Sequence, residues 1–299
     1  MSVVSMPVAP LSIDSQLVLF SQIGLLLGLA VVLGRLALRM GMPALVGELL
    51  AGVVLGPSVL GALAPAAERA LFPADAAQVH LLDAVGQLGV LLLVAVTGMH
   101  LDLSMVRRRL RSTVAVSGSG LVVPLGLGIA LGLLLPASVR GATTSAAAFA
   151  LFLGVAMCVS AIPVIAKALL EMRLLHRDIG QLILGAAAID DIIGWMLLSV
   201  ATATATATVS ARHVLLGFGA VALALLVAWV VGRPLVNGSY RLIARRVPEE
   251  QRPAAAIGTA VTLVFLFAAG SSLLRLEAVL GALFCGLLIG ASSQVELGW

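Results

Sequence analysis

The feature that most limits how this chain can fold is a series of long apolar runs that fill nearly all of its 299 residues. Hydrophobic residues make up 61% of the sequence and charged residues only 11%. A water-soluble domain cannot bury so large an apolar fraction, whereas a helix of about 20 apolar residues crosses a bilayer. We therefore predict an all-α, polytopic membrane protein in which residues 1–299 form one membrane domain.

Hydropathy divides the chain into about nine predicted membrane segments that are joined by short loops. Their approximate limits are 16–38, 43–63, 80–101, 113–135, 145–169, 179–201, 213–232, 254–274 and 277–293. Of the 18 Lys and Arg residues, 14 lie at or after the first, third, fifth and seventh segments. The positive-inside rule therefore predicts that these loops are cytoplasmic and that the N-terminus lies outside.

The same charge pattern indicates which partners to expect. The net charge of +4 lies in loops between apolar runs, so we interpret it as a topology signal and expect membrane lipid, and no nucleic acid, as a partner. A single lysine among the basic residues, with abundant Ala and Gly, is typical of a GC-rich bacterial genome. We expect the protein in the inner (plasma) membrane of a bacterial cell.

An internal repeat links two distant segments. Residues 43–58 (PALVGELLAGVVLGPS) align without gaps to residues 277–292 (EAVLGALFCGLLIGAS), at an offset of 234. The identical pairs are Ala44/Ala278, Gly47/Gly281, Leu49/Leu283, Gly52/Gly286, Gly56/Gly290 and Ser58/Ser292. Two Gly-rich helices can match by chance. However, these two cross the membrane in opposite directions, as in the inverted repeats of secondary transporters.

On the repeat interpretation the chain has three parts. Residues 1–201 form a first six-helix repeat, and residues 202–253 form a linker helix and a cytoplasmic loop. Residues 254–299 begin a second inverted repeat, which is incomplete in this chain.

Asp190 and Asp191 lie near the middle of the apolar segment 179–201. A charge at the centre of a membrane helix costs at least about 2.5–3.5 kcal/mol, so a pair of acids there indicates an ion site. Adjacent helical positions point about 100° apart, so one acid can face a cavity while the other faces an opposing charge. Burial and mutual repulsion favour protonation, so a cation and a proton would compete for the pair. The alternative is a structural acid that is salt-bridged across helices.

Pro163 lies well inside the fifth predicted segment, where it removes a backbone hydrogen bond. Free carbonyls at membrane depth are tolerated where they line a cavity, and broken helices of transporters present them to an ion. We predict an unwound site at Ser160, Ala161, Ile162 and Pro163, with a simple proline kink as the alternative. Asp191, Asp190 and Ser160, with carbonyls near Ala161, would supply the oxygen ligands of a transported Na⁺ or K⁺.

Four stretches resemble the monovalent cation:proton antiporter-2 family: PALVGELLAGVVLGPSVLG from 43, GVLLLVAVTGMHLDL from 89, SAIPVIAKAL from 160 and the Asp-Asp segment. The resemblance implies a thirteen-helix inverted-repeat antiporter fold with a broken fifth helix, and a homodimer. By the resemblance, Asp191 is the essential cation- and proton-binding acid, Asp190 is the second acid, and Ser160 lies in the unwound stretch. The basic partner of the first acid would fall beyond Trp299, so relative to the family the chain is expected to be C-terminally truncated.

The expected function is exchange of Na⁺ or K⁺ for protons by alternating access at the acid pair, with no cofactor. The alternative is a non-transporting remnant or regulatory subunit of such an antiporter. An enzyme is not expected, because intramembrane aspartyl proteases need acids on separate helices within Tyr-Asp and Gly-x-Gly-Asp, and neither sequence occurs. Glu48 resembles the family's Gly-Glu pair, and is interpreted as structural or as an acid of a cytoplasmic funnel.

Overall fold

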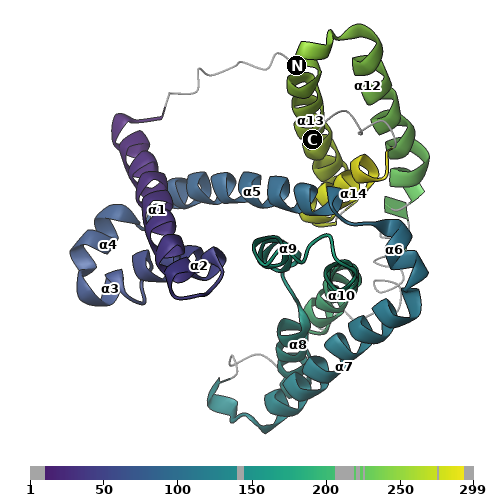
Figure 1. Ribbon diagram of the computed structural model, residues 1–299. Coiled ribbons are helices and arrows are strands. Elements are labelled where there is room, and N and C mark those ends of the chain that lie inside the picture. Colours follow the sequence, from purple (N-terminus) through teal and green to yellow (C-terminus); the bar gives the residue numbers. More distant parts are fainter. Residues whose placement is uncertain are drawn as a thin grey trace, which may run out of the picture. The chain divides into compact units, whose positions relative to one another are not determined.

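The computed structural model describes residues 11–139, 145–205, 219, 223–224, 226–274 and 276–292, and these parts are helical wherever they are regular (Figure 1). The α-helices are α1 (Ile13–Arg39), α2 (Ala44–Leu55), α3 (Leu60–Leu63), α4 (Pro65–Leu71), α5 (Ala76–Met99), α6 (Leu103–Arg108), α7 (Leu110–Leu134), α8 (Ala146–Cys158), α9 (Ile162–Glu171), α10 (Asp178–Ala205), α12 (Arg233–Arg246), α13 (Arg252–Leu273) and α14 (Ala278–Gly290). Two 3₁₀ turns (Ala137–Val139 and Glu249–Gln251) and a π-helical turn (Ala228–Gly232) complete the described elements.

Seven helical stretches within the described residues are long and apolar enough to cross a membrane. They are Ile13–Arg39, Ala44–Leu63, Ala76–Met99, Leu110–Leu134, Ala146–Glu171, Asp178–Leu198 and Glu249–Leu273. With α14, a shorter apolar helix, they coincide with eight of the nine predicted segments. Half of the remaining prediction, 213–232, lies outside the described residues. The all-helical, multi-pass class is therefore confirmed.

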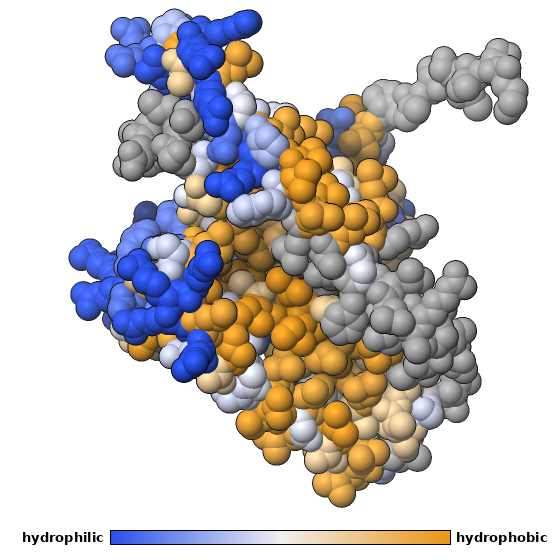
Figure 2. Space-filling model, turned by 90° about the vertical axis from the view of Figure 1, so that its right-hand side faces the viewer, coloured by the Kyte–Doolittle hydropathy of each residue, from blue (hydrophilic) through white to orange (hydrophobic). Residues whose placement is uncertain are grey.

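The surface of the protein is suited to a lipid solvent. Large apolar side chains are exposed along the long helices, for example Leu17, Phe20, Leu27 and Val32 on α1. Figure 2 shows apolar side chains over much of the visible surface, with hydrophilic residues gathered in limited patches. In water such exposure would be costly, whereas lipid tails provide an equally apolar environment.

The chain forms two compact units, Met1–Gly89 and Val90–Trp299. In the first unit, α1 and α2 form a tightly packed hairpin. The hairpin turns at Gly41, whose φ of +77° is one that glycine adopts without strain. A Cβ on Gly47 would overlap the carbonyl group of Leu33, so only glycine lets the two backbones meet at this point.

In the second unit, α13 and α14 form a hairpin with the same register as α1 and α2. A Cβ on Gly281 would overlap the carbonyl group of Phe267, and these residues lie 234 positions after Gly47 and Leu33. The helix ends agree as well, because α1 and α13 end at Arg39 and Leu273, again 234 apart. The similarity found in the sequence of one helix therefore extends to the geometry of a helix pair.

The scaffold around the acid pair consists of α7, α8, α9 and α10, in the second unit. α7 runs along α8, and the contact depends on small residues: a Cβ on Gly128 would lie 2.6 Å from Cα of Gly154, and one on Gly132 would lie 2.5 Å from Cα of Ala150. Small residues let membrane helices approach closely and gain dispersion contacts along their length. α10 packs against α7, α8 and α9, so it is enclosed where the acids lie.

We expect Gly47→Ala and Gly281→Ala each to destabilise the protein, because the added methyl group would displace the backbone of the neighbouring helix. Overpacking of this kind costs about 1–3 kcal/mol. Thermal unfolding of the detergent-purified variants, followed by circular dichroism, measures the effect.

Gly52→Ala in α2 and Gly258→Ala in α13 are the matched controls, since nothing lies within 4 Å of a Cβ at either position. Alanine there should leave the melting temperature unchanged or raise it, because it favours the helix. Equal melting temperatures for all four variants would contradict the close packing of the two hairpins.

Candidate functional site

The two acids that the sequence singled out lie on the enclosed side of α10. Asp190 is 9% exposed and Asp191 is 8% exposed, although their helix is otherwise apolar at this depth. The flanking residues Ala186, Ala187 and Gly194 are also buried and are small, so the neighbouring helices can approach α10 closely. Two carboxylates are thus enclosed by helices within one turn of a membrane-length helix.

Asp190 points toward α7. The hydroxyl group of Ser117 donates a hydrogen bond of 2.5 Å to Asp190 Oδ1. Gly120, one turn further along α7, leaves room for the other carboxylate oxygen: a Cβ there would lie 3.6 Å from Asp190 Oδ2. Ser117 is itself buried, so a buried acid and a buried hydroxyl group satisfy each other.

Asp191 lies about 100° around the helix from Asp190, so it is oriented away from Ser117, the hydrogen-bond partner of Asp190. Within the ranges that the structure describes, no group donates a hydrogen bond to the Asp191 carboxylate. The two acids therefore differ in environment: Asp190 is held by a hydroxyl group, whereas the oxygens of Asp191 remain available to a ligand.

The fifth predicted segment is broken and not merely kinked. α8 and α9 are separated by residues 159–161, and both Val159 (ψ 122°) and Ala161 (ψ 100°) have extended backbones. Pro163 lies in the first turn of α9, where a missing N–H leaves no bond unmade. The prediction that Ile162 and Pro163 belong to the unwound stretch was therefore wrong, because both are helical.

The break lies against α10 close to the acids. A Cβ on Gly194, one turn after Asp190, would lie 3.2 Å from Cγ2 of Val159. The carbonyl group of Ala161 already accepts hydrogen bonds from Val164 and Ile165, 3.1 Å each, so it belongs to the first turn of α9 and is not a loosened carbonyl.

Two carbonyl groups near the acids lie outside regular helical hydrogen bonding. Pro124 lies inside α7 and has no N–H, so the carbonyl group of Gly120, the residue beside Asp190, gains no bond from that position. Val159 lies in the break, so its carbonyl group belongs to the regular part of neither α8 nor α9.

The start of α10 is fixed by one side chain. Gln181, which is buried, donates from Nε2 to the carbonyl groups of His100 and Leu175, 2.8 Å each. Its Oε1 accepts a hydrogen bond of 2.7 Å from the backbone N–H of Asp102. Three hydrogen bonds therefore join α10 to the turns that precede α6 and α10 itself, and they set the height of the acids relative to α7.

Asp102 stabilises the neighbouring turn in a second way. Its carboxylate caps α6 by accepting hydrogen bonds from the backbone N–H groups of Ser104 (2.8 Å) and Met105 (3.2 Å). The hydroxyl group of Ser104 is the main cause that lowers the pKa of Asp102 below its ordinary value, and the two backbone N–H groups lower it further. Beside it, the exposed residues Arg109, which precedes α7, and Asp178, which begins α10, form an ion pair.

Sequence reasoning did not single out Ser117, Gly120 or Gln181. A signal for Ser117 was present, because polar residues inside a membrane segment commonly bond to another helix, but the partner could not be identified.

Glu48 lies half-buried on α2, and its Cγ is 3.6 Å from the position of a Cβ on Gly34 of α1. No group of three or more His, Cys, Asp or Glu residues suited to a metal occurs in the described part of the chain.

An all-helical, multi-pass membrane protein with two acids enclosed beside a broken helix belongs to the class of membrane transport proteins. Comparison with known families makes the class specific: the model of the sodium/hydrogen exchanger transmembrane family matches residues 25–297. The chain therefore belongs to the sodium/hydrogen exchanger family, a family of transporters and not of enzymes. The resemblance to the monovalent cation:proton antiporter-2 group is confirmed.

Similar proteins come from bacteria, plants and fungi. The chain is 36% identical over 192 residues to the Na⁺/H⁺ antiporter NhaS4 of Synechocystis, covering 64% of this chain and 46% of that protein. It is 30% identical over 271 residues to cation/H⁺ antiporter 18 of Arabidopsis thaliana, covering 90% of this chain and 32% of the relative. It is 29% identical over 167 residues to K⁺/H⁺ antiporter 1 of Saccharomyces cerevisiae, covering 54% and 19%. The chain spans less than half the length of each of these relatives.

We expect Ser117→Ala to destabilise the protein by about 1–3 kcal/mol, because a buried carboxyl group would lose its hydroxyl donor. Thermal unfolding in detergent measures the change. Ser119→Ala is the matched control: it removes the hydroxyl group of an exposed serine on the same helix, which donates to the Val116 carbonyl group within that helix. Equal melting temperatures for wild type and Ser117→Ala would argue against the Ser117–Asp190 bond.

We expect Asp102→Ala to lower stability at pH 7 by about 0.5–2 kcal/mol, the usual cost of losing an N-cap. Because the pKa of Asp102 is lower in the folded protein than its value of 3.8 in an unfolded chain, its contribution is present above about pH 4. The contribution is lost as the pH falls through the folded pKa. The difference in melting temperature between wild type and variant should therefore shrink at pH 3, and a difference that grows there would refute the capping role.

Proposed function

We propose that this protein exchanges a monovalent cation, Na⁺ or K⁺, for protons by alternating access at Asp190 and Asp191. The observation that carries the proposal is the enclosure of both carboxylates on α10, against the break between α8 and α9. Keeping two acids out of water, with no basic residue beside them among the described residues, is costly unless a cation or protons bind there.

The two acids have different roles in this mechanism. Asp191 binds the cation or the proton, because its carboxylate accepts no hydrogen bond within the described residues. Asp190 is held toward α7 by Ser117 and adds negative charge to the site. When a cation arrives, the charged form of the pair is favoured and the proton leaves. When the cation leaves, the pair is protonated again, so the two ligands exclude each other.

The oxygen ligands of the cation come from more than one helix. Ser160 lies in the break between α8 and α9 and supplies a hydroxyl group. The carbonyl group of Val159, in the break, and that of Gly120, which Pro124 leaves without its helical donor, add neutral oxygens near the acids. A set of carboxylate, hydroxyl and carbonyl oxygens suits a hard monovalent cation such as Na⁺ or K⁺. The relatives do not separate the two ions, since their names include Na⁺/H⁺ and K⁺/H⁺ antiporters.

We also propose the larger architecture that this mechanism needs. The shared register of the α1–α2 and α13–α14 hairpins supports an inverted repeat, with residues 1–201 as the first copy and residues 254–299 within the second. The proposal includes a thirteen-helix transporter fold, a homodimer, a cytoplasmic position for the Arg-rich loops and a place in a bacterial inner membrane. Glu48 is proposed as a structural residue of the α1–α2 hairpin.

Transport is tested in proteoliposomes that contain the protein and a pH-sensitive dye. We expect addition of NaCl or KCl to release protons from the wild-type protein. Asp191→Asn should abolish this release, because the amide cannot exchange a proton at the site. Asp190→Asn should reduce it and alter the charge moved per cycle, measured as a change in transport current.

The matched control is Asp178→Asn, which removes an exposed acid from the same helix. Its ion pair with Arg109 is solvent-exposed and contributes at most about 1 kcal/mol, so exchange should stay close to the wild-type rate. Retained exchange in Asp191→Asn would refute the assignment of the site. If the wild-type protein itself gave no cation-dependent proton release, the alternative of a non-transporting remnant or regulatory subunit would be favoured instead.

A further inference from the structure

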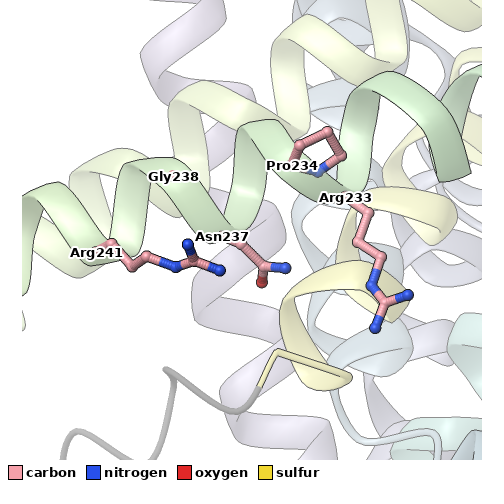
Figure 3. A pocket seen from close by; sticks show the side chains of 5 residues that line it. All are labelled: Arg233, Pro234, Asn237, Gly238 and Arg241. Atoms are coloured by element: carbon pink, nitrogen blue, oxygen red, sulfur yellow. The ribbon is translucent and has the colours of Figure 1, made fainter.

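A small basic cavity lies outside the acid site, on α12. It has a volume of about 250 Å³ and is lined by Arg233, Pro234, Asn237, Gly238 and Arg241 (Figure 3). The three polar residues follow one another at intervals of four, so they lie along one side of the helix. Figure 3 shows Asn237 between the two arginine side chains.

The charge of this cavity is not neutralised by the described residues. The sequences of the π-helical turn and of α12 contain no acidic residue. Arg109–Asp178 and Arg252–Glu249 are ion pairs of the described part of the chain, and neither involves Arg233 or Arg241. Two guanidinium groups that border one cavity without a counter-charge attract an anion.

The side chains of Arg233 and Asn237 are held in place before any ligand binds. The guanidinium group of Arg233 lies 4.6 Å from the centre of the Trp229 ring, a cation–π contact that restrains it. Asn237 Oδ1 accepts a hydrogen bond of 2.8 Å from Ser292, which leaves the amide Nδ2 group as the donor offered to a ligand. The space beside Gly238 is open, since nothing lies within 4 Å of a Cβ at that position.

The surroundings of the cavity place it at the level of lipid head groups. Trp229 is 62% exposed, and Val230, Val231 and Leu235 are exposed as well. Exposed tryptophan is characteristic of the membrane interface, and arginine lies on the polar side of that boundary. The opposite face of α12 is packed into the core through Val236, Tyr240 and Ile243. The cavity therefore opens where an apolar surface changes into a basic one.

We propose that Arg233, Asn237 and Arg241 form a binding site for the phosphate group of an anionic membrane phospholipid. A guanidinium group donates two parallel hydrogen bonds to phosphate oxygens, and the Asn237 amide adds a third donor. Arg233 and Arg241 are about 12 Å apart along the helix, so a phosphate beside Asn237 lies between them. The acyl chains then lie along Trp229, Val230 and Val231. A free phosphate ion would use the same donors but would gain nothing from this apolar surface.

Native mass spectrometry of the detergent-purified protein tests the site, with phosphatidylglycerol, phosphatidylcholine and inorganic phosphate as separate probes. We expect phosphatidylglycerol to bind more tightly than phosphatidylcholine, and inorganic phosphate to bind weakly. R233Q/R241Q should weaken phosphatidylglycerol binding on the order of tenfold, because both guanidinium groups are removed. Equal affinity for the two lipids, or tight Arg-dependent binding of inorganic phosphate, would overturn the assignment to an anionic lipid.

The matched control is R245Q/R246Q, which removes the same two charges from the same helix outside the cavity. It should change phosphatidylglycerol affinity less than twofold. Equal losses in the two double variants would mean that binding follows the net charge of α12, and the proposal would fail. R233K/R241K provides a second variant if R233Q/R241Q does not fold: it keeps the charge but loses the planar fork, and should bind several-fold more weakly. Wild-type affinity in that variant would also overturn the site.

Discussion

The enclosure of two carboxylates in an apolar helix is the constraint on which the described structure of the second unit most depends. Within a bilayer no water is available to solvate a polar group, so each one must find a partner in the protein or a bound ion. Around Asp190 and Asp191 the chain provides a hydroxyl group from Ser117 and space at Gly120. It also provides a helix break at residues 159–161 against the same turn of α10. The site is thus a small group of polar side chains among helices that otherwise pack through apolar residues.

Helix packing in this protein depends on small residues where backbones meet. Gly47, Gly281, Gly128 and Gly132 each lie where a Cβ would collide with a neighbouring backbone or side chain. Between membrane helices there is little hydrophobic driving force, because lipid tails are as apolar as leucine side chains. Close approach therefore supplies the attraction, and it also fixes the register of each pair. The equal registers of α1–α2 and α13–α14 follow from one glycine position that the two hairpins share.

Much of the fold could be predicted from the sequence, because membrane helices are local features. Eight of the nine predicted segments coincide with apolar helices, and the predicted break falls within three residues of its observed position. The error at Ile162 and Pro163 has a physical reason: proline is compatible with the first turn of a helix, so it can begin α9 as readily as it can interrupt a longer helix. The candidate site was predicted only in part. Asp190 and Asp191 could be found because placing a charge at the centre of a membrane helix costs free energy. Ser117 lies 73 residues before Asp190, and no local pattern links it to the two acids.

The sequence by itself determined that this is a multi-pass membrane protein of the sodium/hydrogen exchanger family with two acids at membrane depth. Apolar length, charge distribution and family motifs are properties of the chain that need no tertiary contact. The tertiary structure alone decided that Asp190 faces α7 while Asp191 accepts no hydrogen bond from the described residues. It alone brought Arg233, Asn237 and Arg241 to one cavity. Hydrogen bonds and close contacts depend on distances between residues that are remote in the sequence, and those distances exist only once the helices have packed.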